Sequence, residues 1–327
     1  MSAIFESHLQ WGRDSRLNSP GPVRNEHSAS DHDVLRRLYA KMLTCRMARE
    51  SAHALVRNGR IACSGVSFIA AEAAEVGATY DLQPSDSLTT WQHDVFTNLL
   101  KGASLGQVFA QLLGQTAGSN VRDNLASWNI IPPASTLAGQ LSLATGVALA
   151  YKHQGQRNVV LALCGQGFAA LGMWHDAARL AAEQRLPLIF VIDSGRMRDQ
   201  DSNHWFGPAE DLSHRAHAYG FPGITVDGND AVAVFRVTQE SIHRARSGAG
   251  PTLVECKSLH PFRETTAERP GSGRRRRRIP VFPSDPLAHM EHYLSHRGAW
   301  RSSWKRQLVE QIAGEIDKAI TLAENER

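Results

Sequence analysis

Residues 159–196 read VVLALCGQGFAALGMWHDAARLAAEQRLPLIFVIDSGR and decide the fold. The apolar run at the start of this stretch predicts a strand, which the turn Gly165-Gln166-Gly167 ends. A segment with helical periodicity follows as far as Arg185, and residues 188–192 predict a second strand. Apolar strands on both sides of a helix are typical of a parallel β-α-β unit that is buried on both faces. Because such sheets bind ligands at the carboxyl ends of their strands, we expect any ligand near residues 165–172 and 193–197.

The rest of the chain adds helices and strands around this unit. We expect residues 1–30 to form an extended arm that lies on a neighbouring subunit, and residues 31–327 to form a single domain. Helices are predicted over 32–59, within 67–82, and over 104–114, 135–153, 211–219, 231–246 and 289–326, and further strands over 87–91, 223–226 and 251–257. The small residues of 135–153 predict a helix that is packed closely on several sides, inside the protein or across a subunit interface. Strands alternating with helices indicate an α/β fold with a doubly wound sheet.

Composition and charge exclude several classes of protein. The formal net charge of the 327 residues is +4, and five positive charges belong to the single run Arg274–Arg278. No general nucleic-acid or membrane role is therefore implied. The four cysteines lack metal-ligand spacing and the N-terminal sequence lacks an export signal, which together predict a cytoplasmic protein with reduced thiols. We expect no transition-metal site from the fifteen histidines.

The arginine run lies in residues 263–282, which we interpret as a mobile surface loop, ahead of C-terminal helices over 287–327. A solvated loop is the simpler interpretation of Arg274–Arg278. Five adjacent guanidinium groups would also attract an acidic surface, a phosphate group or nucleic acid, although no aromatic residues alternate with them as specific RNA recognition would require.

Several short motifs occur in an order that resembles a known family. The resemblance runs from about Leu35 to the C-terminus and is to the alpha subunit of thiamine-diphosphate-dependent 2-oxo acid dehydrogenases, such as the pyruvate, branched-chain and acetoin enzymes. The motifs that carry it are Met42, Arg46 and Glu50; Ala71-Glu72-Ala73; Gln140 to Lys152; Leu186-Pro187; Val226 to Asp230; Gly250 to Glu255; and Ser284 to Pro286.

The resemblance implies the thiamine-diphosphate-binding α/β fold, a doubly wound and mostly parallel sheet flanked by helices. It implies thiamine diphosphate and magnesium as cofactors, and oxidative decarboxylation of a 2-oxo acid with acyl transfer to a lipoyl group. That reaction makes the family oxidoreductases with a disulfide acceptor. A beta subunit that completes a heterotetramer, self-association, and contact with a lipoyl-bearing acyltransferase are the implied partnerships.

The resemblance also assigns the site residues. His93 occupies the position of a catalytic histidine at the active-site entrance. The cofactor-binding positions are Gly165, Gln166, Gly167, Gly195 and Met197, of which Gln166, Gly195 and Met197 correspond to metal ligands.

At these positions the sequence departs from the family pattern. The family turn is GDG, and Gln166 replaces its aspartate; Gly195 replaces the second metal ligand, an asparagine. Trp91 replaces a diphosphate-binding arginine, and Ala170 an asparagine. Because magnesium prefers anionic and carbonyl oxygens in an octahedron, the amide carbonyl of Gln166 and the backbone oxygen of Met197 are a reduced set.

A shifted loop that brings Asp193 or Ser194 to the metal is one way to restore the missing ligands. Without such a shift, the glycine turn is better interpreted as a structural turn. Two hypotheses stay open: an alpha subunit whose cofactor binding is weakened or lost, and a non-catalytic pseudoenzyme that serves as a structural or regulatory partner.

Overall fold

The computed structural model describes residues 29–61, 71–90, 95–114, 125–132, 134, 136–165, 167–168, 172–194, 196–197, 211–260 and 285–325. A five-stranded sheet with the order β1-β2-β3-β6-β5 forms its centre, and all neighbouring strands are parallel. The strands are β1 (Ser87–Thr89), β2 (Val160–Gly165), β3 (Leu188–Asp193), β5 (Gly223–Asp227) and β6 (Thr252–Lys257). The chain moves outward from β1 to β3, reaches the edge at β5 and returns to β6, which is the reversal of a doubly wound sheet. The predicted fold class is confirmed.

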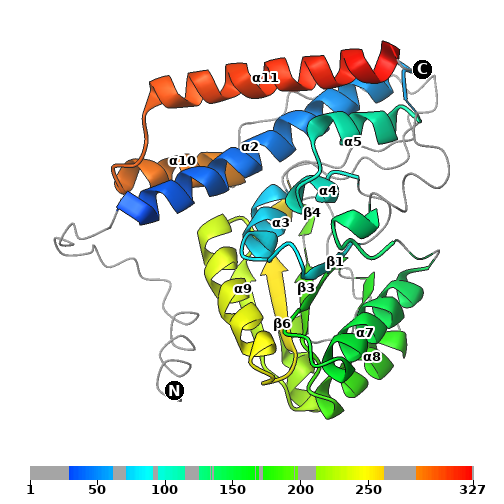
Figure 1. Ribbon diagram of the computed structural model, residues 1–327. Helices are drawn as coiled ribbons and strands as arrows, with labels where there is room; N and C mark the ends of the chain where they lie inside the picture. Colours follow the sequence, from blue (N-terminus) through cyan, green and yellow to red (C-terminus); the bar gives the residue numbers. More distant parts are fainter. Residues whose placement is uncertain are drawn as a thin grey trace.

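Helices cover both faces of the sheet (Figure 1). Alternate residues of each strand point to opposite faces, and both faces are covered, so β2 and the first five residues of β3 are apolar. One face packs against α7 (Leu137–His153), α8 (Gly172–Glu183) and the 3₁₀ helix η3 (Leu212–Tyr219). The other packs against α3 (Glu72–Thr79) and α9 (Ala231–Arg246), which approach each other closely at Gly77.

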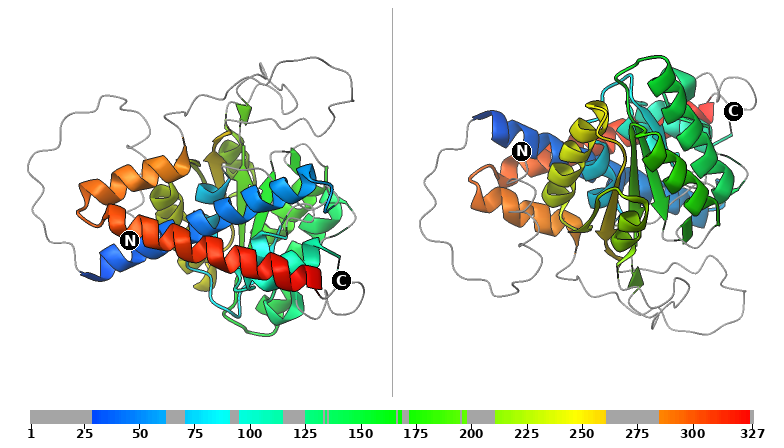
Figure 2. Two further views of the ribbon diagram at one scale, coloured as in Figure 1. Left: turned by 90° about the horizontal axis from the view of Figure 1, so that it is seen from above. Right: turned by 90° about the horizontal axis from the view of Figure 1, so that it is seen from below.

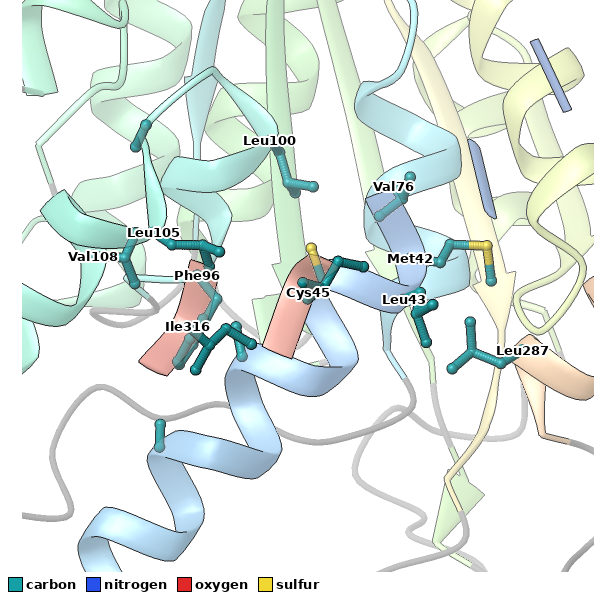
Figure 3. Close-up of a cluster of buried hydrophobic side chains, with 14 of the residues drawn as sticks. Met42, Leu43, Cys45, Val76, Phe96, Leu100, Leu105, Val108, Leu287 and Ile316 are labelled. Atoms are coloured by element: carbon teal, nitrogen blue, oxygen red, sulfur yellow. The ribbon is translucent and has the colours of Figure 1, made fainter. Parts of the chain in front are cut away.

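A separate layer of helices lies beyond one end of the sheet (Figures 1 and 2). It contains α2 (Ala29–Arg57), α4 (Thr97–Leu100), α5 (Leu105–Leu112), α10 (Pro286–His296) and α11 (Ser302–Asn325). Its core is shown in Figure 3, where Met42 and Cys45 of α2 face Val76, Phe96 and Ile316 from other elements. None of the described helices is long and apolar enough to cross a membrane.

Several predicted boundaries need correction. Helix α2 begins at Ala29, so the last two residues of the expected N-terminal arm, 29 and 30, lie in a helix. The C-terminal helices expected over 287–327 are α10 and α11, which Gly298, with φ +69°, separates. Residues 212–219 form a 3₁₀ helix. The loop 263–282, with Arg274–Arg278, lies outside the described residues.

Candidate functional site at the carboxyl edge of the sheet

The glycine turn lies at the carboxyl edge of the sheet, as predicted. Gly165 ends β2 and pairs in register with Asp193, which ends β3. Phe168 is buried among the side chains of α7 and α8, so it fixes the turn to the core. Gly167 is exposed, and a Cβ added there would have no atom within 4 Å. The turn therefore presents open backbone on the side where the family would place a diphosphate.

The end of β3 is tied to β6 rather than directed at the turn. Ser194 donates its backbone N–H to the carbonyl of Cys256 at 2.9 Å, and its hydroxyl contacts the same oxygen at 3.3 Å. Beyond Ser194 the chain continues as β4 (Arg196–Met197), which pairs with β7 (Leu259–His260). Ser194 is therefore tied to β6 at the end of β3 and is not directed at the glycine turn.

The donors that the described residues place here do not fit a magnesium diphosphate group. No three histidine, cysteine, aspartate or glutamate side chains converge on one point within the described ranges. Gln166, Gly195 and His93 lie outside those ranges, so their assignments stay predictions. The sequence gives an amide at 166 and no side chain at 195, whereas magnesium requires several well-placed oxygens. Met197 lies in β4, the short strand that follows β3 in the chain, and would contribute only a backbone oxygen.

Three of the segments that carry the family resemblance meet in space. Arg46 of α2 forms ion pairs with Glu72, which begins α3, and with Asp285, which precedes α10. Glu72 is fully buried. Burial alone would lower the pKa of the Arg46 guanidinium, but the two carboxylates outweigh it and raise that pKa. Asp285 also caps α10 by accepting the N–H of Leu287 at 3.0 Å. These motifs hold the helical layer to the sheet.

A second buried ion pair lies beside the first and was not predicted. Arg49 has no exposed surface, and its Nη2 contacts Glu75 Oε2 at 2.5 Å. The guanidinium also lies over the ring of Phe96, 5.7 Å from its centre. The spacing gives the only signal in the sequence, since Arg46 and Arg49 are three residues apart, as are Glu72 and Glu75.

Two further motifs also have structural roles. In the segment Val226–Asp230, the Asp227 carboxylate accepts the N–H of Asn229, and Asp230 caps α9 by accepting two backbone N–H groups. At the end of the segment Gly250–Glu255, the buried Glu255 carboxylate accepts the N–H of Ser213 at 2.8 Å. Each interaction holds a turn or a helix end against the sheet.

The cysteine side chains in the described residues behave as core residues. Cys45, Cys164 and Cys256 are free thiols and all are buried. Burial raises the pKa of Cys164, and it raises that of Cys256 together with neighbouring carboxylates. Neither thiol is therefore suited to act as a nucleophile.

The chain is similar to known dehydrogenase subunits. A family model for the dehydrogenase E1 component matches residues 39–327. The pyruvate dehydrogenase E1 component subunit alpha of Staphylococcus aureus (strain Mu50 / ATCC 700699) is 27% identical over 321 residues, which cover 94% of this chain and 84% of that protein. The subunit of the same name from Bacillus subtilis (strain 168) is 28% identical over 314 residues, covering 95% and 84%. Among solved structures, a Mycobacterium smegmatis protein assigned as a thiamin diphosphate-dependent enzyme aligns with 17% identity and a TM-score of 0.38 over 59% of this chain and 32% of that one.

Proposed function

The chain belongs to the dehydrogenase E1 component family, and from that premise we propose that it is an alpha-type subunit in which magnesium-dependent binding of thiamine diphosphate is weak or absent. The observation that carries the proposal is the carboxyl edge of the sheet. Its glycine turn has open backbone at Gly167, while the aspartate and asparagine expected of the family are Gln166 and Gly195. The chain keeps the helices and strands of the family, but its sequence lacks two of the side-chain oxygens that would bind the cofactor.

The family reaction is decarboxylation of a 2-oxo acid with acyl transfer to a lipoyl group. The proposal assigns this reaction to active relatives and not to this chain. In active relatives the carbanion chemistry is supplied by the cofactor, and the protein supplies binding and orientation. A chain that does not hold the diphosphate contributes no part of that chemistry. What it still offers is a folded surface for a beta subunit or for a second copy of itself, in a cytoplasmic assembly.

A second candidate is that the chain is wholly non-catalytic and acts as a structural or regulatory partner of a dehydrogenase subunit. The Arg46 ion pairs support this candidate, because motifs of the family that do not bind the cofactor keep a structural role in this chain. The two candidates differ in one measurable quantity, the affinity for magnesium thiamine diphosphate.

The decisive experiment is calorimetric titration of the full chain with thiamine diphosphate and Mg²⁺, with and without a co-expressed beta subunit. We expect weak or undetectable binding in both cases. Measurable but weak binding with the beta subunit would exclude the second candidate, whereas undetectable binding agrees with both. Tight, magnesium-dependent binding would overturn the proposal.

Restoring the ligands tests whether only they were lost. In the double variant Gln166→Asp with Gly195→Asn, we expect magnesium-dependent binding to appear or to strengthen. The matched control is Gln156→Asp, which places the same charge on an exposed loop before β2 and should leave binding unchanged. Equal binding by the double variant and the control would mean that more than two ligands separate this chain from active relatives.

A further inference from the structure

The exposed face of α10 contains a histidine pair at the spacing HxxxH. His292 and His296 lie one helical turn apart and are both exposed. Their Nε2 atoms are 3.2 Å apart, and their ring centres are 4.4 Å apart. Side chains at positions i and i+4 of a helix lie on the same face, so the two rings face the same region of solvent.

The separation of the two nitrogens suits a shared metal ion. Imidazole nitrogens bind zinc at about 2.1 Å, which puts two ligands of one ion about 3.0 Å apart at an octahedral angle and about 3.4 Å apart at a tetrahedral one. The Nε2 separation of 3.2 Å falls between these values. The nitrogens therefore already lie at the required separation, and the rings need to turn their lone pairs toward one point to bind an ion together.

The helix beneath the pair is firmly held. Asp285 caps its first turn and is itself paired with Arg46. Leu287, Met290 and Leu294 are buried against the helical layer. Two ligands on a rigid element lose little conformational freedom when they bind an ion.

The neighbouring polar groups explain why the site has two ligands rather than three. Glu291 Oε1 accepts the Tyr39 hydroxyl at 2.7 Å and the Lys305 ammonium at 2.6 Å, so that carboxylate is engaged on the inner side of the helix. The Ser295 hydroxyl donates to the backbone carbonyl of Glu291. Within the described ranges no group of three metal-binding side chains forms, and water would complete the coordination shell.

We propose that His292 and His296 form a bidentate surface site for a divalent transition-metal ion such as Zn²⁺ or Ni²⁺. In the present pair one Nε2–H donates a hydrogen bond to the other Nε2. On binding, that ring moves its proton to Nδ1 through solvent, so both Nε2 lone pairs face the ion and no net proton is released. Imidazole suits Zn²⁺ and Ni²⁺, whereas Mg²⁺ prefers oxygen. The site is therefore independent of the cofactor question at the sheet.

The test is a calorimetric titration of the full chain with Ni²⁺ in a buffer that does not bind metals. We expect saturable binding that weakens by at least about tenfold in either His292→Ala or His296→Ala. His289→Ala is the matched control, because His289 is exposed on the same helix but is not paired with a second ring. Affinity unchanged in both pair variants, or reduced equally in the control, would overturn the proposal.

A stability measurement gives a second, independent readout. An ion that binds only the folded chain shifts the folding equilibrium by about a hundredfold when its concentration is about a hundred times its dissociation constant. We expect Ni²⁺ to raise the urea midpoint of the unaltered chain by more than that of His292→Ala, while Mg²⁺ has equal effects on both. An equal response of the two proteins to Ni²⁺ would contradict the site.

Discussion

The amino end of the central sheet is closed around one buried carboxylate, whereas the carboxyl end carries the glycine turn. At the amino end, the fully buried Asp86 carboxylate accepts four hydrogen bonds. They come from the N–H groups of Gln83 and Val159 and from both terminal nitrogens of Arg246, at 2.7–3.0 Å. At the carboxyl end, Gly165 and Asp193 border a turn in which Gly167 is exposed. The buried carboxylate at one end holds loops together, and the turn at the other end is open to a ligand.

Residues at the two ends of a parallel sheet serve different purposes. Parallel sheets bind ligands at the carboxyl ends of their strands, so residues there can change with little effect on packing. Residues at the opposite end join loops that the sheet needs in order to form. Substitutions at the amino end should therefore cause large losses of stability, and those at the carboxyl end should cause small losses or none.

The largest effect is expected for Asp86→Ala. The change leaves the partly buried Arg246 guanidinium and two backbone N–H groups without their acceptor. Removing one partner of a buried ion pair costs about 3–5 kcal/mol of unfolding free energy. Urea unfolding monitored by circular dichroism measures this loss.

The control for that variant is Asp81→Ala. Asp81 is exposed, and its contact with Gln239 is a weak one at 3.3 Å. Its removal should change stability by less than about 0.5 kcal/mol. Similar losses for the two aspartates would mean that the amino end of the sheet is not the stabilising one.

The next largest effect is expected for Gly223→Ala at the start of β5. A Cβ there would lie 1.9 Å from the backbone oxygen of Ser213, and Ser213 is held by the buried Glu255 carboxylate. Because η3 cannot move away without losing that bond, we expect a loss of about 2–3 kcal/mol, at the upper range for overpacking. A loss below about 0.5 kcal/mol would show that η3 is not fixed against β5.

The sequence predicts this architecture better than it predicts the polar interactions. Helix α9 has the predicted bounds of Ala231 and Arg246, because Asp230 caps it and its apolar residues recur with helical periodicity. The buried pair Arg49–Glu75 was missed, since a charged residue within a helical pattern is usually interpreted as exposed.

The candidate site was predicted in place but not in full. The glycine turn follows β2, where the strand pattern put it, and Gly165 is the last residue of that strand. Its chemistry depends on side chains outside the predicted helices and strands, where no periodicity constrains the geometry. The binding roles of Gly165, Gly167 and Met197 and the assignments of His93, Gln166 and Gly195 therefore remain predictions for binding measurements to decide.

A smaller effect is expected for Gly228→Ala at the carboxyl end of β5. The added Cβ would lie 2.2 Å from the Ser258 hydroxyl and 3.0 Å from the Ser258 backbone nitrogen. The hydroxyl can rotate away, but the backbone must shift slightly, so we expect a loss of about 1 kcal/mol in urea unfolding. A loss as large as that of Gly223→Ala would show that this end of the sheet is packed as rigidly as the other.

The smallest effect on stability is expected for Gly167→Ala in the glycine turn itself. A methyl group there meets no atom within 4 Å, and the position does not need a left-handed backbone, so the unfolding free energy should change by less than about 0.5 kcal/mol. Binding is the sharper readout. In a turn that cradles a diphosphate, the same methyl group would obstruct the approach of phosphate to the backbone and weaken binding. If this turn only joins a strand to a helix, neither quantity changes. Unchanged stability with a measurable loss of thiamine diphosphate affinity would thus show that the carboxyl end of the sheet still binds its ligand, and would sharpen the contrast between the two ends.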